Sequence, residues 1–260
     1  MSAIFIDGHL AHYEVIGRGK PVLFLHGWIG SWRYWVPTMQ AISTTNRAYA
    51  IDFWGFGESA KNSLYTINDQ AQLLYSFVDR IGLSQFSIVG HGFGSIVAFE
   101  FARRHPDLVD KMINIGFPLT FNHLNSRYLN SDSNSLIEKI IKTSVDIDAI
   151  RNDALKNDPY ANKILLDSFE KHPQWHDYDF RKVCLLVYGL NDPLLKTSFI
   201  ENDLPLSSNY HSIHFEESGY FPMLDESSKF TRLLTEFLEL SEDDALRDLQ
   251  IKEKWQRRVR

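Results

Sequence analysis

The sequence predicts an α/β protein with a mostly parallel sheet covered by helices on both faces. Short apolar runs alternate along the chain with longer segments that have helical spacing. The apolar runs are continuous rather than alternating with polar residues, which is typical of strands buried on both faces. A polar stretch in the middle of the chain interrupts this rhythm before it returns. We therefore expect one sheet whose two halves are separated by an insertion.

The first half of the chain supplies four expected strands and two expected helices. The strands are expected at Pro21–Leu25, Arg47–Asp52, Phe86–Gly90 and Lys111–Gly116. The helices are expected at Asn68–Ile81 and Gly94–His105, and Pro106 stops the second one. Because ligands of parallel sheets bind at the carboxyl ends of the strands, a site is expected in the turns that follow these strands.

The second half begins with the insertion. Residues 118–178 are polar and rich in Asn, Asp and Ser, and they contain an expected helix at Ser135–Thr143. Ser135 and Glu138 have the S-x-x-E spacing of a capping box, so the helix is expected to begin there. Strands at Val183–Tyr188 and Tyr210–Phe215 and a helix at about residues 223–240 then complete the expected sheet.

Residues 241–260 predict a helical extension. Acidic residues come first and basic residues last, which suits the dipole of a helix. Ile251, Trp255 and Val259 recur every four residues and form an apolar stripe. We expect this helix to pack on its own domain, or to bind a protein partner or a second copy of the chain.

Composition excludes several classes of function. The chain has 260 residues and a formal net charge of −6, and its basic residues cluster only at the extreme C-terminus, which argues against nucleic-acid binding. No apolar run reaches the roughly 18 residues of an integral membrane span, and the N-terminus does not resemble a signal peptide. The single cysteine, Cys184, is expected to be a buried structural residue of a cytoplasmic protein. The sequence has no metal-ligand cluster and no P-loop, so neither a metal nor a cofactor is expected.

Five motifs together resemble the landmarks of the α/β-hydrolase fold family. They are Leu25–Trp28 (LHGW), Asp52–Ser59 (DFWGFGES), Val89–Gly94 (VGHGFG), Gly189–Pro193 (GLNDP) and Ser218–Leu224 (SGYFPML). Each motif alone is weak, but all five occur in the family's order over about residues 4–240. The resemblance implies a mostly parallel eight-stranded sheet in a core of residues 1–117 and 179–240. It also implies a small helical cap at 118–178, with 241–260 as an extension.

The motifs that carry the family's catalytic triad are degenerate here. In the family a serine nucleophile occupies the middle of a G-x-S-x-G turn between a strand and a helix, and in this chain Gly92 stands there. The family's catalytic histidine follows the last strand, and Tyr220 stands at that position. The acid that orients the histidine is kept as Asp192. A tyrosine of ordinary pKa near 10 is protonated at neutral pH and does not replace imidazole as a base.

Other residues near these positions have structural interpretations. Ser95 is expected at the start of the helix that follows Gly92, and His214 is expected to be a strand residue. Asp192 either forms the turn before Pro193 or keeps a hydrogen bond to Tyr220, and the sequence leaves both open.

The resemblance also assigns the surroundings of the triad. Two backbone N–H groups bind the developing oxyanion in the family, and they correspond here to Trp28 and Phe93. We expect these backbone donors to persist because they do not depend on side chains. Further residues of the motif loops are expected to line the pocket: His26, Gly27, Phe53, Trp54 and His91.

These observations predict a pseudoenzyme rather than an ordinary serine hydrolase. We expect it to bind a small apolar ligand between cap and sheet, or to act through a protein partner. One alternative is an atypical enzyme with weak esterase activity or lyase-like acid/base chemistry. The other is an interaction protein that acts through the cap and the C-terminal helix, with the old pocket filled.

Overall fold

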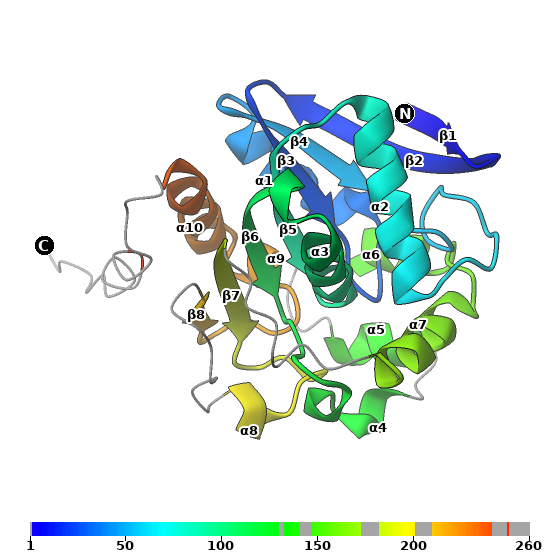
Figure 1. Cartoon of the computed structure of the whole chain (residues 1–260). Helices are drawn as coiled ribbons and strands as arrows, with labels where there is room; N and C mark the ends of the chain where they lie inside the picture. Colours follow the sequence, from blue (N-terminus) through cyan, green and yellow to red (C-terminus); the bar gives the residue numbers. More distant parts are fainter. Residues whose placement is uncertain are drawn as a thin grey trace, which may run out of the picture.

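The computed structural model describes residues 2–129, 133–140, 147–172, 182–200, 210–240 and 249, which form an eight-stranded sheet with helices (Figure 1). The strand order is β1-β2-β4-β3-β5-β6-β7-β8. The strands are β1 (Ser2–Ile6), β2 (His9–Gly17), β3 (Lys20–Leu25), β4 (Asn46–Ile51), β5 (Phe86–His91), β6 (Val109–Ile115), β7 (Val183–Gly189) and β8 (Tyr210–Phe215). Strands β3 to β8 pair in parallel, whereas β1–β2 and β2–β4 are antiparallel. The predicted mostly parallel α/β sheet is confirmed.

The antiparallel hairpin β1–β2 has no counterpart among the expected strands. Its outer strand alternates between exposed and partly buried residues, so it lacks the continuous apolar run that marked the parallel strands. Asp7 and Gly8 both have positive φ and form its two-residue turn, since Ile6 pairs with His9. Asp-Gly is a strong hairpin signal in a sequence, so this turn was the available clue.

The helices lie in the connections between successive strands of the chain and after the last strand. The described α-helices are α1 (Val36–Ile42), α2 (Ile67–Ile81), α3 (Phe93–Arg104), α4 (Ser126–Leu129), α5 (Ser133–Ile140), α6 (Ile147–Ala154), α7 (Ala161–Glu170), α8 (Thr197–Ile200), α9 (Pro222–Asp225) and α10 (Ser227–Glu239). Three short 3₁₀ segments, η1 (Trp32–Trp35), η2 (Pro106–Leu108) and η3 (Phe121–His123), complete the described set. Helices α2 and α3 pack side by side in front of the strands in Figure 1, and α1 contacts α10.

Two expected helix boundaries are wrong. Helix α5 begins at Ser133, so Ser135 lies inside the helix and the expected capping box with Glu138 does not mark its start; residues 141–143 lie outside the described residues. The expected helix at 223–240 is two helices, because Glu226 has a non-helical backbone between α9 and α10. The carboxylate of Glu226 accepts a hydrogen bond from Ser218, which fixes this break.

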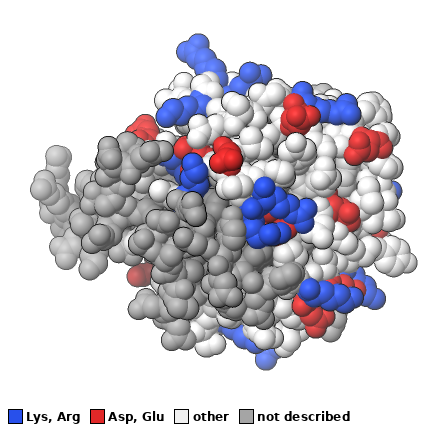
Figure 2. Space-filling view, in the orientation of Figure 1, with Lys and Arg blue, Asp and Glu red and all other residues white. Residues whose placement is uncertain are grey.

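The C-terminal extension lies outside the described residues apart from Leu249, which is buried. Among the described residues, no helix has both the length and the apolar content to cross a bilayer. On the face drawn in Figure 2, basic and acidic side chains are interspersed rather than gathered into one field.

The segment between β6 and β7 contains η3 and helices α4 to α7, and α4, α5 and α7 lie beyond the arrowheads of these strands (Figure 1). Ion pairs connect α6 and the residues just after it to the segments that follow β3 and β4. Asp153 binds the guanidinium of Arg33 at 2.8 Å and accepts a hydrogen bond from the Ser31 hydroxyl. Lys156 binds Glu58 at 2.7 Å. The segment is therefore held over the end of the sheet where a site was expected.

Replacing the cap residue of α2 is expected to destabilise the fold measurably. The Thr66 side chain accepts from the Asp69 N–H at 3.2 Å, and the Asp69 carboxylate accepts from the Thr66 N–H at 3.0 Å. Thr66→Ala should lower the free energy of unfolding by about 1 kcal/mol, as loss of an N-cap usually does. Urea unfolding measures this change. The control is Thr44→Ala in an exposed turn, and an equal loss in both variants would contradict the assignment.

Candidate active site

The turn between β5 and α3 has the strand–turn–helix form of a nucleophile elbow. Gly92 lies between these elements with φ 50° and ψ −109°. Its N–H donates to the Ile115 carbonyl at 2.7 Å, which ties the turn to β6. The Ser95 hydroxyl donates back to the Gly92 carbonyl from within the first turn of α3. Positive φ at this position suits glycine, which adopts such a backbone without the steric cost of a Cβ atom.

The ring of Tyr220 occupies the space above Gly92. A Cβ atom placed on Gly92 would lie 3.0 Å from Cζ of Tyr220 and closer still to its hydroxyl oxygen. A Cβ on Gly27 would meet the same hydroxyl. The Trp28 N–H donates to this oxygen at 3.0 Å, so the backbone donor expected to bind an oxyanion is engaged by the phenol. Tyr220 is only 2% exposed, and it fills the position where a serine side chain would stand.

A chain of buried hydrogen bonds fixes Tyr220 from behind. The Gly27 N–H donates to the Tyr34 hydroxyl at 2.7 Å, and this hydroxyl lies 2.9 Å from Nδ1 of His91. Nε2 of His91 lies 2.7 Å from the carbonyl oxygen of Tyr220. A carbonyl only accepts, so Nε2 carries the proton and Nδ1 accepts from Tyr34. Burial lowers the pKa of His91 to about 3, so the ring is neutral and connects loops rather than serving as a base.

Asp192 is buried without a basic partner among its described contacts. Its Oδ1 accepts from the Leu194 N–H at 2.8 Å, which is the local bond of a turn-forming aspartate. No hydrogen bond joins Asp192 to Tyr220, although the structure describes both residues. Burial raises the pKa of the Asp192 carboxyl to about 7, and the bond from Leu194 opposes this only in part. The described contacts of Asp192 are therefore those of a turn-forming aspartate.

The motif loops around the elbow pack their aromatic rings together. His26 donates from Nδ1 to the Gly27 carbonyl at 2.9 Å and accepts the Phe53 N–H on Nε2 at 3.1 Å. The ring of Phe93 lies edge-on to Trp28 at 5.5 Å and to Phe53 at 6.2 Å. His26, Phe53 and Phe93 are fully buried. His26 and Phe53, which were expected to line a pocket, are therefore part of a packed layer of rings.

The other expected residues lie apart from the elbow. Trp54 is buried and its N–H donates to the Gln70 side chain at 3.0 Å. His214 is an exposed residue of β8. Cys184 is buried in β7, and burial raises the pKa of its thiol, so it has the expected structural role. Tyr34, which links Gly27 to His91, belongs to none of the five motifs; as an aromatic residue it was a candidate to line a cavity, but its hydrogen bonds were not predicted.

The protein matches the family model described as alpha/beta hydrolase fold over residues 20–138. Its structure is similar to a serine-to-glycine mutant of the N-acyl homoserine lactonase AidH in complex with N-hexanoyl homoserine lactone, with 17% identity, a TM-score of 0.80, and coverage of 91% of this chain and 96% of that chain. The chain has the α/β-hydrolase fold. The structure is also similar to an epoxide hydrolase from Bacillus megaterium, with 19% identity and a TM-score of 0.75. The match covers 92% of this chain and 100% of that chain.

Curated relatives of this α/β-hydrolase-fold protein include enzymes of several kinds. A probable lysophospholipase of Arabidopsis thaliana, BODYGUARD 3, is 36% identical over 38% of this chain and 21% of its own length. A soluble epoxide hydrolase of Corynebacterium sp. (strain C12) is 32% identical over 41% of this chain and 38% of its own. Epoxide hydrolase 4 of Mus musculus is 32% identical over 41% of this chain and 31% of its own length. The chain thus matches well under half the length of these relatives.

Removing the Tyr220 hydroxyl is expected to destabilise the protein. Tyr220→Phe leaves the buried Trp28 N–H without its acceptor, which should lower the free energy of unfolding by about 1–3 kcal/mol. Denaturant unfolding measures the loss. Tyr75→Phe removes the hydroxyl of a residue that is 37% exposed and should change stability by less than about 0.5 kcal/mol. If both variants lose the same amount, the bond to Trp28 is not stabilising.

Asp192 is expected to make stability depend on pH. Its folded pKa of about 7 lies above the unfolded value near 3.9, so the carboxyl contributes less to the free energy of unfolding as pH rises from 4 to 7. Asp192→Asn stays neutral and keeps an acceptor for Leu194. Relative to the native protein it should gain roughly 2–4 kcal/mol between pH 4 and pH 7.

Chemical unfolding at a series of pH values checks this expectation for Asp192. The exposed Asp107→Asn variant is the control and should follow the native profile. Parallel curves for the native protein and Asp192→Asn would show that this carboxyl titrates as it does in the unfolded chain.

Proposed function

We propose that this chain is a non-hydrolytic α/β-hydrolase-fold protein, a pseudoenzyme that works by binding. The observation that carries the proposal is the ring of Tyr220 above Gly92. Covalent catalysis requires an attacking atom, and glycine has none. An acyl group therefore has no place to attach, and the space it would enter is filled by the phenol.

The remaining parts of a hydrolase mechanism are also compromised. Burial raises the pKa of Tyr220 well above its usual value, so the phenol stays protonated and is no proton acceptor at neutral pH. In enzymes that lose triad members, a residual acceleration of about 10³–10⁴ comes from the oxyanion hole and substrate binding. Here the Trp28 N–H donates to Tyr220 instead, which weakens that remaining source of catalysis.

Binding without a nucleophile is compatible with this fold. The lactonase mutant to which the structure is similar has a serine changed to glycine and is complexed with its lactone. In the proposal, this chain binds a small apolar ligand or a protein partner through the segment between β6 and β7. Leu155 and Tyr160 are 65% and 67% exposed there and offer apolar surface. The single buried Cys184 suits a protein of the reducing cytoplasm.

One observation favours a second candidate, an atypical enzyme with acid/base chemistry. The Asp192 carboxyl has a pKa raised by burial to about 7, so it gains and loses a proton near neutral pH. A lyase-like reaction would use that proton and need no serine. Against this candidate, Asp192 is 6% exposed and its carboxylate is engaged in a local turn. An activity that disappears in Asp192→Asn would favour it over the pseudoenzyme.

Hydrolysis of p-nitrophenyl butyrate tests the proposal. The native protein should be inactive, and Gly92→Ser/Tyr220→His should exceed it by at least about a hundredfold, because this pair restores nucleophile and base. Gly92→Ser alone should be destabilised, since its Cβ would collide with the Tyr220 hydroxyl.

Gly92→Ser/Tyr220→Phe is the matched control for this assay, because it supplies a serine without a base, and it should stay inactive. Efficient turnover by the native protein would refute the pseudoenzyme proposal. Loss of that turnover in Asp192→Asn would point to the second candidate.

A further inference from the structure

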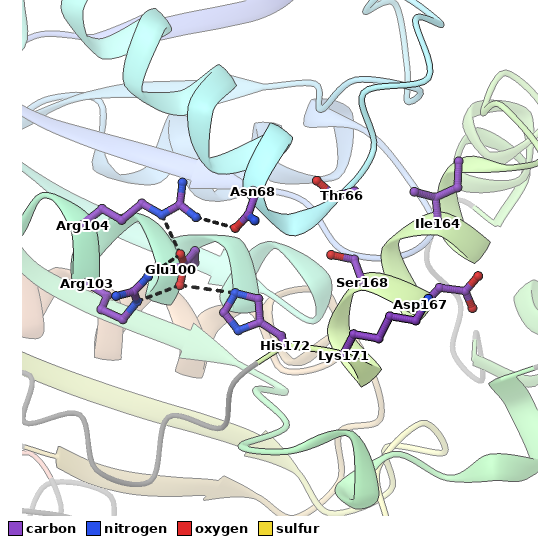
Figure 3. A pocket seen from close by; sticks show the side chains of 10 residues that line it. All are labelled: Thr66, Asn68, Glu100, Arg103, Arg104, Ile164, Asp167, Ser168, Lys171 and His172. Atoms are coloured by element: carbon purple, nitrogen blue, oxygen red, sulfur yellow. Dashed lines mark hydrogen bonds and ion pairs between the residues drawn. The ribbon is translucent and has the colours of Figure 1, made fainter.

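A groove of about 550 Å³ lies between α2, α3 and α7, and no triad position lines it (Figure 3). Its volume is in the range of small-molecule sites. Residues of the first turn of α2 form one wall, the end of α3 forms the floor, and α7 forms the other wall. The groove is therefore a second candidate site, built from different residues than the elbow.

Two arginines on the floor are positioned by one buried carboxylate. Arg103 donates to Glu100 from Nε at 2.9 Å and from Nη2 at 2.8 Å, and Arg104 donates from Nε at 2.6 Å (Figure 3). The Glu100 side chain is fully buried, whereas those of Arg103 and Arg104 are 41% and 31% exposed. Arg104 also donates to Asn68 on α2. Both guanidiniums thus line the groove in fixed positions.

The lining carries more positive than negative formal charge. Three cationic side chains, Arg103, Arg104 and Lys171, face two carboxylates, Glu100 and Asp167, which leaves a formal surplus of one positive charge before any contribution from histidine. The chain as a whole has a net charge of −6, so the surplus is local. A positively charged groove in an acidic protein attracts anions.

The start of α2 fixes the opposite wall. The Ile67 N–H, in the first turn of this 15-residue helix, donates to the Ser168 hydroxyl of α7 at 3.1 Å. The Asp69 carboxylate of the capping box lies at the same helix end, so the positive charge of the groove comes from its cationic side chains and not from the helix. Ser168 therefore joins α7 to the start of α2, on the same groove that holds the arginines.

We propose that this groove binds a small polyanion that carries phosphate or carboxylate groups, anchored by Arg103 and Arg104. A guanidinium has five N–H donors, more than the two that each arginine places on Glu100 or Asn68, and its charge-assisted bonds to phosphate and carboxylate oxygens are strong. Glu100 holds the two side chains in place before the ligand arrives, which reduces the entropy lost on binding. Ile164 is the only aliphatic side chain among the described residues of the lining, and the other side chains all carry a polar or charged group.

Titration of the native 260-residue chain with sodium phosphate and with citrate tests this site. Ionic strength is held constant with sodium chloride, and binding is followed by calorimetry and by ¹H–¹⁵N spectra. Saturable binding is expected, with the amide shifts concentrated at Asn68, Ser168 and Lys171. Tighter binding of phosphate would identify a phosphate ester as the ligand class, and tighter binding of citrate would identify a polycarboxylate.

Variants of the groove locate the binding. Arg104→Gln should weaken it roughly tenfold by removing one charge-assisted contact. Arg18→Gln makes the same charge change in the turn between β2 and β3, outside the groove, and should leave the affinity within about twofold. If Arg104→Gln fails to fold, Lys171→Glu at the exposed end of α7 gives the answer, with a loss of roughly fivefold.

The proposal is overturned if neither anion binds the native protein. It is equally overturned if both anions bind all variants alike, or if the amide shifts gather away from α2, α3 and α7.

Discussion

The phenol of Tyr220 determines what the rest of this site is able to do. Its hydroxyl lies among Gly27, Gly92 and the Trp28 N–H, and only residues without a Cβ atom leave it room. The hydrogen bonds through Tyr34 and His91 hold the backbone of Tyr220, so the ring is fixed from two sides. What would be a reaction centre is part of the hydrophobic core at this point.

Because the elbow is packed, the surfaces proposed for binding lie at the periphery of the fold. The segment between β6 and β7 is tied down by the pairs of Arg33 with Asp153 and of Lys156 with Glu58. These pairs are partly exposed, so each adds little to stability, but together they fix where the segment lies. At its far end the same segment contributes α7 to the charged groove. One insertion therefore contributes to both surfaces proposed for binding.

The sequence predicted the elements that depend on local pattern. Continuous apolar runs and helical spacing predicted the parallel strands and helices α2 and α3. The order of the motifs predicted that Gly92 lies at the turn between a strand and a helix. Contacts between distant residues were not predictable in this way. The bond from Trp28 to Tyr220 spans 192 positions, and nothing near either residue indicates that the phenol reaches this amide rather than Asp192.

The same reasoning applies to the groove. Glu100, Arg103 and Arg104 have the spacing of neighbours on a helix face, which the sequence shows, but the approach of α7 to α2 depends on tertiary packing.

The close fit of the Tyr220 ring over Gly92 also limits which substitutions the two positions accept. A lineage that gained a serine at position 92 first would have to displace the phenol, at a cost in stability. One that gained a histidine at position 220 first would leave the Trp28 N–H without its acceptor, while Gly92 still supplies no nucleophile. Under the proposed function, a hydrolytic site therefore requires both substitutions together, and the packing of Tyr220 opposes either one made alone.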